Sequence, residues 1–158
     1  MKVLISTDGS DDAVAAARQA LAVLAPAETV TLVCVVEPPA IEAAGMESGM
    51  AGGLATADEI DSAWTAVNAE AAVALDRTDA ALAGAVPSGT IFERVLEEGA
   101  AGPAVCRLAE SLAVDVVVVG SRGRGAIRRA LMGSVSTHVT NNAPCPVLVV
   151  RTGTDGEG

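Results

Sequence analysis

Five short runs of apolar, mostly β-branched residues punctuate this chain, and they constrain the fold more than any other feature. The run DVVVV (115–119) is continuously apolar after its first residue. This pattern is typical of a central parallel strand that is buried on both faces. The other four runs are KVLIST (2–7), TVTLVCVV (29–36), TIFERVL (90–96) and PVLVV (146–150). Strands that alternate with longer crossover segments predict an α/β fold with a parallel sheet and right-handed connections.

The segments between these runs have the residue spacing of helices. Ser10 is a favoured helix N-cap residue, and apolar residues then recur at spacings of three and four as far as Leu24. A second helical pattern starts at Glu59, and a third follows the break at 99–103, where Pro103 suits a first helical turn. A fourth helical segment extends to about Asn142.

Two stretches lack such a pattern. Residues 38–57 contain glycine, methionine and alanine without a period, and they form either a mobile lid or a passive, disordered excursion. The polar tail at 152–158 is predicted to be disordered. Residues 1–151, which include the stretch at 38–57, are predicted to form a single domain, because 158 residues is an ordinary length for one domain.

The composition argues against several classes of protein. A net charge of −10 and a pI near 4.4 disfavour a duplex nucleic-acid binder, because neutralised phosphates supply most of that affinity. One tryptophan, one phenylalanine and no tyrosine leave little surface for stacking on single-stranded bases. No apolar run approaches the roughly 18 residues of a membrane span, and the first residues lack a signal-peptide cleavage pattern. We therefore expect a cytoplasmic protein with neither a nucleic-acid nor a membrane partner.

The cysteines and the one histidine point to no metal site. Cys34, Cys106 and Cys145 are scattered and include no CxxC pair, and His138 has no Cys or acidic neighbour at ligand spacing. We expect structural roles for all four residues.

The segment GSRGRGAIRRALMGS (120–134) directly follows the most apolar run. Its spacing is Gly120-x2-Gly123-x9-Gly133-Ser134. Glycines permit a positive φ and allow a ligand to approach the backbone, and successive amides can form an anion-binding nest. Gly133 to Ser136 offer further amides and two hydroxyls. The pattern is neither a P-loop nor the usual dinucleotide fingerprint. On glycine content alone, a phosphate cradle and a plain strand-to-helix turn are equally supported.

A second polar segment is expected beside this one. STDGS (6–10) follows the first strand, and ligands of parallel sheets bind beyond the carboxyl ends of the strands. The two segments are therefore predicted to meet at one edge of the sheet.

The spacing and several other segments resemble the universal stress protein family. Its nucleotide-binding members carry G-x2-G-x9-G-[ST], and the likeness extends to STDGS, DVVVVGSRGRG and the ending APCPVLVVR. The resemblance implies a five-stranded, Rossmann-like sheet of order 3-2-1-4-5 and a homodimer. It also implies ATP as the ligand, which we expect to carry Mg²⁺.

Site residues are carried over by position. The resemblance implies ribose and phosphate contacts from Gly120, Gly123, Gly133, Ser134, Val135 and Ser136. Ser6 and Asp8 join the site from the first segment, where Asp8 suits ribose hydroxyls or the base edge. Val35 would pack against adenine. Asp8 could instead be only a turn former before Gly9, and Val35 only a core residue.

Four arginines, Arg122, Arg124, Arg128 and Arg129, raise the local affinity for anions. The family motif does not require them, and a solvated helix face is the better interpretation of Arg128 and Arg129. The resemblance also implies that two copies pair through the last strand, at Val147, Leu148, Val149 and Val150.

Three functions remain open on the sequence. The first is an ATP-binding stress regulator that switches as a homodimer and acts on an unidentified downstream protein. The second is an enzyme that hydrolyses ATP slowly or transfers an adenylyl group. The third is a dimeric interaction module that binds no nucleotide.

Overall fold

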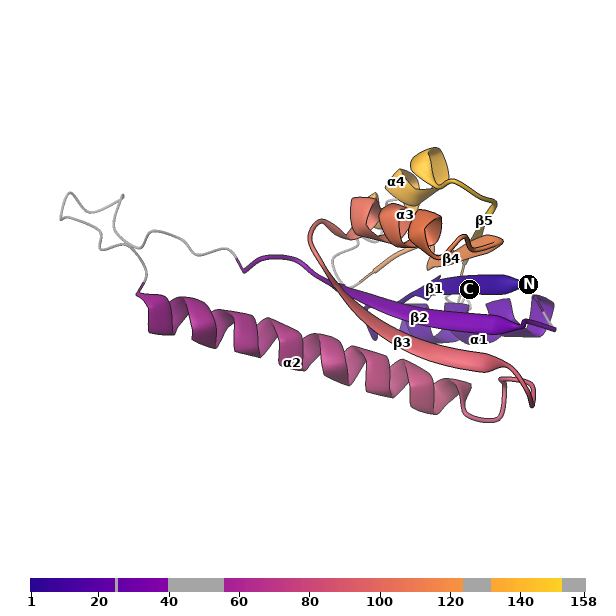
Figure 1. The fold of residues 1–158 in the computed structure, drawn as a ribbon, viewed down its shortest axis with the longest axis horizontal. Helices are drawn as coiled ribbons and strands as arrows, with labels where there is room; N and C mark the ends of the chain where they lie inside the picture. Colours follow the sequence, from indigo (N-terminus) through magenta and orange to yellow (C-terminus); the bar gives the residue numbers. More distant parts are fainter. Residues whose placement is uncertain (25, 40–55, 124–131, 152–158) are drawn as a thin grey trace, which may run out of the picture.

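The computed structural model describes residues 1–24, 26–39, 56–123 and 132–151. The described strands form one parallel sheet of order β3-β2-β1-β4-β5 (Figure 1). The strands are β1 (Lys2–Ser6), β2 (Thr29–Val36), β3 (Ile91–Glu98), β4 (Val116–Gly120) and β5 (Val147–Val150). The predicted α/β fold and strand order are therefore confirmed.

Helices cover both faces of the sheet (Figure 1). One face packs against α1 (Asp11–Val23) and α2 (Ala57–Leu82), and the other packs against α3 (Ala101–Ser111) and α4 (Ser134–Asn142). The alternating side chains of the strands divide accordingly. Val3 and Ile5 of β1 face the α1–α2 layer, whereas Leu4 faces the α3–α4 layer. The result is a three-layer sandwich with two apolar cores.

β1 is the central strand of the sheet, and β4 is one of its two neighbours. Each of Val3, Leu4 and Ile5 is at most 1% exposed, and the four valines of β4 are all buried. This agrees with the continuous apolar run at 116–119, because a strand covered on both faces has no polar side.

The helix boundaries differ slightly from the sequence prediction. α2 starts two residues before Glu59, because Thr56 caps the helix and Glu59 closes a capping box with it. The carboxylate of Glu59 accepts hydrogen bonds from the backbone N–H and the side-chain hydroxyl of Thr56. Both bonds lower the pKa of Glu59, and the backbone bond has the larger effect. α3 starts at Ala101, so Pro103 lies in its first turn, where a missing N–H costs no helical bond.

α3 and α4 approach each other closely at one glycine. A Cβ on Gly102 would lie 2.7 Å from Cβ and Cγ of His138. His138 of α4 thus packs against α3, and its structural role stays a prediction. None of the three cysteines forms a disulfide.

Several predictions fall on residues that the structure does not describe. These are the excursion at 38–57, of which residues 40–55 are not described, the polar tail at 152–158, and Arg124, Arg128 and Arg129. Within the described ranges, no helix is both long and apolar enough to span a bilayer.

Candidate functional site

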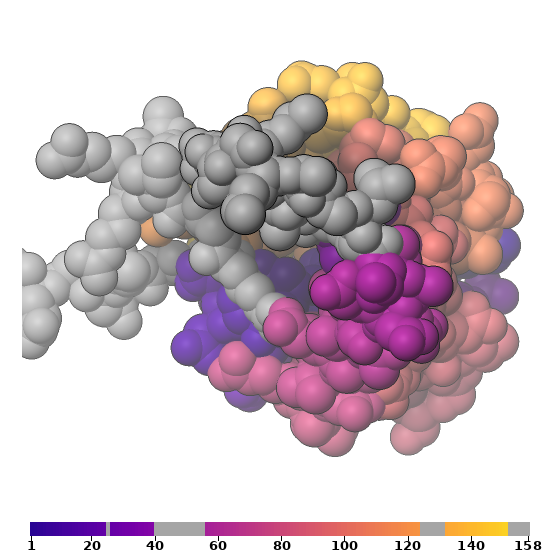
Figure 2. Space-filling model, turned by 90° about the vertical axis from the view of Figure 1, so that its left-hand side faces the viewer, coloured from indigo at the N-terminus to yellow at the C-terminus, as the bar shows by residue number. Residues whose placement is uncertain are grey.

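A cavity of about 560 Å³ lies beyond the carboxyl ends of β1, β2 and β4. Figure 2 looks along the strands onto this edge of the molecule, with α4 in yellow and α2 in magenta. Since β2 lies on one side of β1 and β4 on the other, this edge includes the point at which the strand order reverses. Such a point is the usual ligand site of an open parallel sheet.

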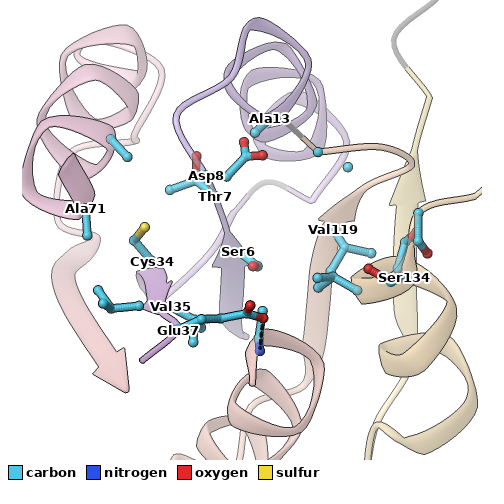
Figure 3. Close-up of a pocket in the computed structure, with 18 of the residues that line it drawn as sticks. Ser6, Thr7, Asp8, Ala13, Cys34, Val35, Glu37, Ala71, Val119 and Ser134 are labelled. Carbon is cyan, nitrogen blue, oxygen red and sulfur yellow. Dashed lines mark hydrogen bonds between the residues drawn. The ribbon is translucent and has the colours of Figure 1, made fainter. Parts of the chain in front are cut away.

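All nine predicted site residues line this one cavity. They come from four separate parts of the chain and are Ser6, Asp8, Val35, Gly120, Gly123, Gly133, Ser134, Val135 and Ser136. In Figure 3, Val35 and Cys34 lie on one side of the cavity, Val119 and Ser134 on the other, and Ser6 and Asp8 between them. The fold therefore brings STDGS together with the two described ends of the glycine-rich segment, 120–123 and 132–134, as their positions after β1 and β4 predicted.

A hydrogen-bonded turn fixes the carboxylate of Asp8. Its Oδ1 accepts from the backbone N–H of Ser10 at 3.0 Å and from the Ser10 hydroxyl at 2.6 Å. The Ser10 hydroxyl in turn accepts from the backbone N–H of Ala13 and caps α1. Asp8 thus forms the turn that its position before Gly9 predicts, and it also lines the cavity.

The same turn is tied to α2. Arg77 donates to the carbonyl oxygen of Gly9 at 2.7 Å and forms an ion pair with Asp11. Next to this turn, in the core, the hydroxyl oxygens of Thr7 and Thr78 lie 2.8 Å apart. The position of Asp8 over the cavity is therefore set by both β1 and α2.

The three motif glycines do not act through positive φ, which corrects one expectation from the sequence. None of them has a φ in the left-handed region. A Cβ on Gly123 would lie 2.8 Å from Oδ2 of Asp8, and one on Gly120 would lie 3.2 Å from the carbonyl oxygen of Arg122. A Cβ on Gly133 would meet protein atoms only at ordinary contact distances, the nearest at 3.6 Å. Gly120 and Gly123 thus allow other parts of the protein to approach closely, and neither has a left-handed φ.

Fewer donors are free at the start of α4 than the sequence implied. The N–H of Gly133 donates to the carbonyl of Ser121 at 2.8 Å, and the one proton of the Ser136 hydroxyl is shared between that carbonyl, at 3.2 Å, and the carbonyl of Gly133, at 3.0 Å. The amides of Ser134, Val135 and Ser136 occupy the first helical turn, where α-helical geometry gives them no intrahelical acceptor. They carry the positive end of the helix dipole, and this turn contains no acidic side chain.

Sequence reasoning missed several lining residues. The α2 helix supplies Val67, Ala71 and Ala74, of which Val67 and Ala71 belong to the apolar stripe visible from Glu59 onward. Glu37 and Glu70 add two carboxylates that no motif marks. Oε1 of Glu37 accepts from the backbone N–H of Ala101 at 3.4 Å (dashed in Figure 3).

The cavity is polarised by this arrangement. Apolar side chains of β2 and α2 line one side, together with Glu37 and Glu70. The turn after β4, which includes Arg122, and the start of α4 with its backbone amides line the other side. An elongated ligand with an apolar, hydrogen-bonding head and an anionic tail fits this distribution of charge.

The model of the universal stress protein family matches residues 1–151 of the chain. The chain belongs to the universal stress protein family. Universal stress protein Sll1654 from Synechocystis sp. is 37% identical over 62 residues, which cover 39% of this chain and 40% of that protein. The chain matches the first curated relatives over only 28% to 43% of their lengths.

Solved structures of universal stress proteins share the fold. Universal stress protein UspA from Lactobacillus plantarum superposes with a TM-score of 0.75 at 23% identity, covering 96% of this chain and 97% of that one. A universal stress protein crystallised in complex with cAMP superposes with a TM-score of 0.56 at 26% identity, covering 95% of each chain.

Proposed function

We propose that this universal stress protein binds ATP in the cavity and acts as a nucleotide-dependent regulator in the stress response. The observation that carries the proposal is the convergence of nine predicted residues from four segments on one cavity. Its volume of about 560 Å³ falls within the roughly 300–1,000 Å³ of small-molecule sites. The relative that was crystallised with cAMP supports an adenine nucleotide as the ligand.

The charge distribution favours one orientation of ATP. Adenine would pack on Val35 and on the apolar side of α2, and Asp8 would accept from ribose hydroxyls. The phosphates would accept from the amides of Ser134, Val135 and Ser136, which point toward an anion by helix geometry. Bound ATP would supply a negative charge that bridges α4 and the turn after β4.

Magnesium would be held mainly by the phosphates. The described residues include no group of three His, Cys, Asp or Glu side chains that could hold a metal ion. Mg²⁺ commonly keeps several waters and binds through substrate phosphates with few protein ligands, so such a site suits it.

The two edge strands favour a homodimer through β5. The outer strand β3 carries four charged residues, whereas β5 is VLVV and is only half-buried at three of its four positions. Charged side chains protect an edge from pairing, and an uncharged apolar edge invites it. We infer that two copies pair through Val147, Leu148, Val149 and Val150.

A hydrogen bond connects that edge with the nucleotide site. The N–H of Ser121 donates to the carbonyl of Val150 at 2.8 Å, and Ser121 directly precedes Arg122 of the cavity. Ordering of the turn by phosphates would therefore act on the end of β5, and this contact supports a switch that couples nucleotide to dimer.

A regulator is favoured over a fast enzyme. His138 packs against α3 and does not line the cavity, and the described lining residues pair no nucleophile with a histidine base. Radiolabelled ATP with product analysis tests this point. Turnover well above about 1 s⁻¹, in the usual range of enzymes, would refute it. A cytoplasmic location stays a prediction.

Thermal unfolding tests the ligand. The protein, shown to carry no nucleotide from purification, is heated with Mg²⁺ and ATP, ADP, AMP or GTP, or in buffer. A ligand at 100 times its Kd adds about 2.7 kcal/mol to the free energy of unfolding, which corresponds to about 5–10 °C in a domain of this length. We expect that shift with ATP. No shift with any nucleotide would favour the interaction module instead.

A further inference from the structure

Arg122 is held at the phosphate side of the cavity by its neighbours. Gly120 has no side chain, and this leaves room for the backbone carbonyl oxygen of Arg122, which lies 3.2 Å from where a Cβ of Gly120 would be. On either side of it, Ser121 bonds to β5 and to the start of α4, and Gly123 lies against Asp8. The backbone at position 122 is thus fixed relative to both β4 and α4.

The guanidinium of Arg122 has an unfilled donor. Its Nε is buried and has no hydrogen-bond partner, although the residue as a whole is partly exposed. Among the described residues, Arg122 also forms no ion pair. Leaving such a group unpaired is costly, because a buried N–H loses water without gaining an acceptor. Arg122 as a residue lines the cavity and is partly exposed, so an anionic ligand there would offer its side chain an acceptor.

No other described lining residue is basic. The remaining charged residues of the lining are Asp8, Glu37 and Glu70, and all are acidic. On a chain of net charge −10, these carboxylates disfavour an anion unless a cation offsets them locally. Arginine suits this task, because its planar fork matches the oxygens of a phosphate.

We propose that the Arg122 side chain is the specificity-determining residue that ranks adenine nucleotides by phosphate charge, so that ATP binds more tightly than ADP, AMP and adenosine. The proposal rests on the proposed nucleotide function and assigns this selectivity to one side chain. The amides of α4 are backbone groups and remain in every variant, so the contribution of the guanidinium can be separated from theirs.

Isothermal titration calorimetry with ATP, ADP, AMP and adenosine tests the proposal on wild-type protein, Arg122→Gln and Arg18→Gln. Arg18 is exposed on α1 and does not line the cavity, so its substitution is a matched change of charge. We expect wild type to bind ATP more tightly than adenosine. Arg122→Gln should lower that affinity ratio by about 10- to 100-fold, the value of one charge-assisted hydrogen bond. Arg18→Gln should leave the ratio within about twofold.

The possible failures are distinct. If wild-type protein binds ATP and adenosine equally well, there is no selectivity for Arg122 to provide, and the inference is wrong. The proposed binding of nucleotide would be unaffected by that result. The same holds if Arg122→Gln weakens both ligands by the same factor, as a merely structural residue would. If wild type binds no adenine nucleotide at all, the proposed function fails and the inference fails with it.

Discussion

A chain of buried hydrogen bonds beneath the cavity gives the sharpest stability prediction. The Thr78 hydroxyl donates to the carbonyl of Ala74 at 2.9 Å, and the Thr7 oxygen accepts from the N–H of Gly9 at 3.0 Å. The two hydroxyl oxygens are 2.8 Å apart. Because the Thr78 proton is already committed, Thr7 must donate to Thr78. These bonds tie the turn that carries Asp8 to α2.

Thr78→Val removes the acceptor of the Thr7 hydroxyl. Thr78 is 0% exposed and Thr7 is 5% exposed, so water cannot replace the lost partner. A buried donor left without an acceptor costs about 1–3 kcal/mol, and the added methyl group offsets part of that cost. We therefore expect a loss of about 1–2 kcal/mol, which corresponds to about 2–8 °C in Tm for a domain of this length.

Thermal unfolding followed by circular dichroism measures this loss. Thr65→Val is the matched control, because Thr65 is an exposed residue of the same helix and its hydroxyl is not buried. Adding Thr7→Val to Thr78→Val should cost less than the sum of the single changes, since the two residues share one bond. If Thr78→Val unfolds at the same temperature as Thr65→Val, the chain of hydrogen bonds does not stabilise the turn.

Three further predictions concern the rest of the fold. Gly102→Ala should lower Tm by a few degrees, because the new methyl group would be overpacked against His138. Overpacking costs about 1–3 kcal/mol, whereas replacing a glycine in a helix gains about 1 kcal/mol. An unchanged Tm would show that α3 and α4 can move apart. Leu148→Glu should convert a dimer to a monomer in light scattering, and an unchanged mass would exclude β5 as the interface. Burial raises the pKa of the Cys106 and Cys145 thiols, so both should react with a thiol reagent more slowly at pH 8 in folded protein than in guanidinium; equal rates would refute their burial.

The strands were predictable because parallel strands leave a strong signal. The four valines at 116–119 are apolar on both faces, which is typical of a buried parallel strand. β2 was predicted with the boundaries that the structure gives it. The start of α2 was missed by two residues, because the cap at Thr56 lies in a stretch whose composition resembles a loop.

The site was predictable to the extent that it follows strand ends. Residues after β1 and β4 had to meet at one edge, and the resemblance to the universal stress protein family supplied the individual residues. The carboxylates of Glu37 and Glu70 were not predictable, because only the tertiary structure brings their elements to the cavity. The positive φ expected at Gly123 is absent, and its close approach to Asp8 was not predictable, since the two residues are far apart in the sequence.

Calorimetric titration of ATP with Mg²⁺ into wild-type protein and Gly123→Ala tests the central claim most directly. A methyl group at this position would lie 2.8 Å from Oδ2 of Asp8, whose Oδ1 is held by Ser10, so the carboxylate or the turn has to move. We predict one ATP per chain with a Kd near micromolar, about −8 kcal/mol, and binding at least about tenfold weaker in the variant. Wild-type protein that binds no ATP, or a variant that binds it equally well, would contradict the assignment of this cavity as the nucleotide site.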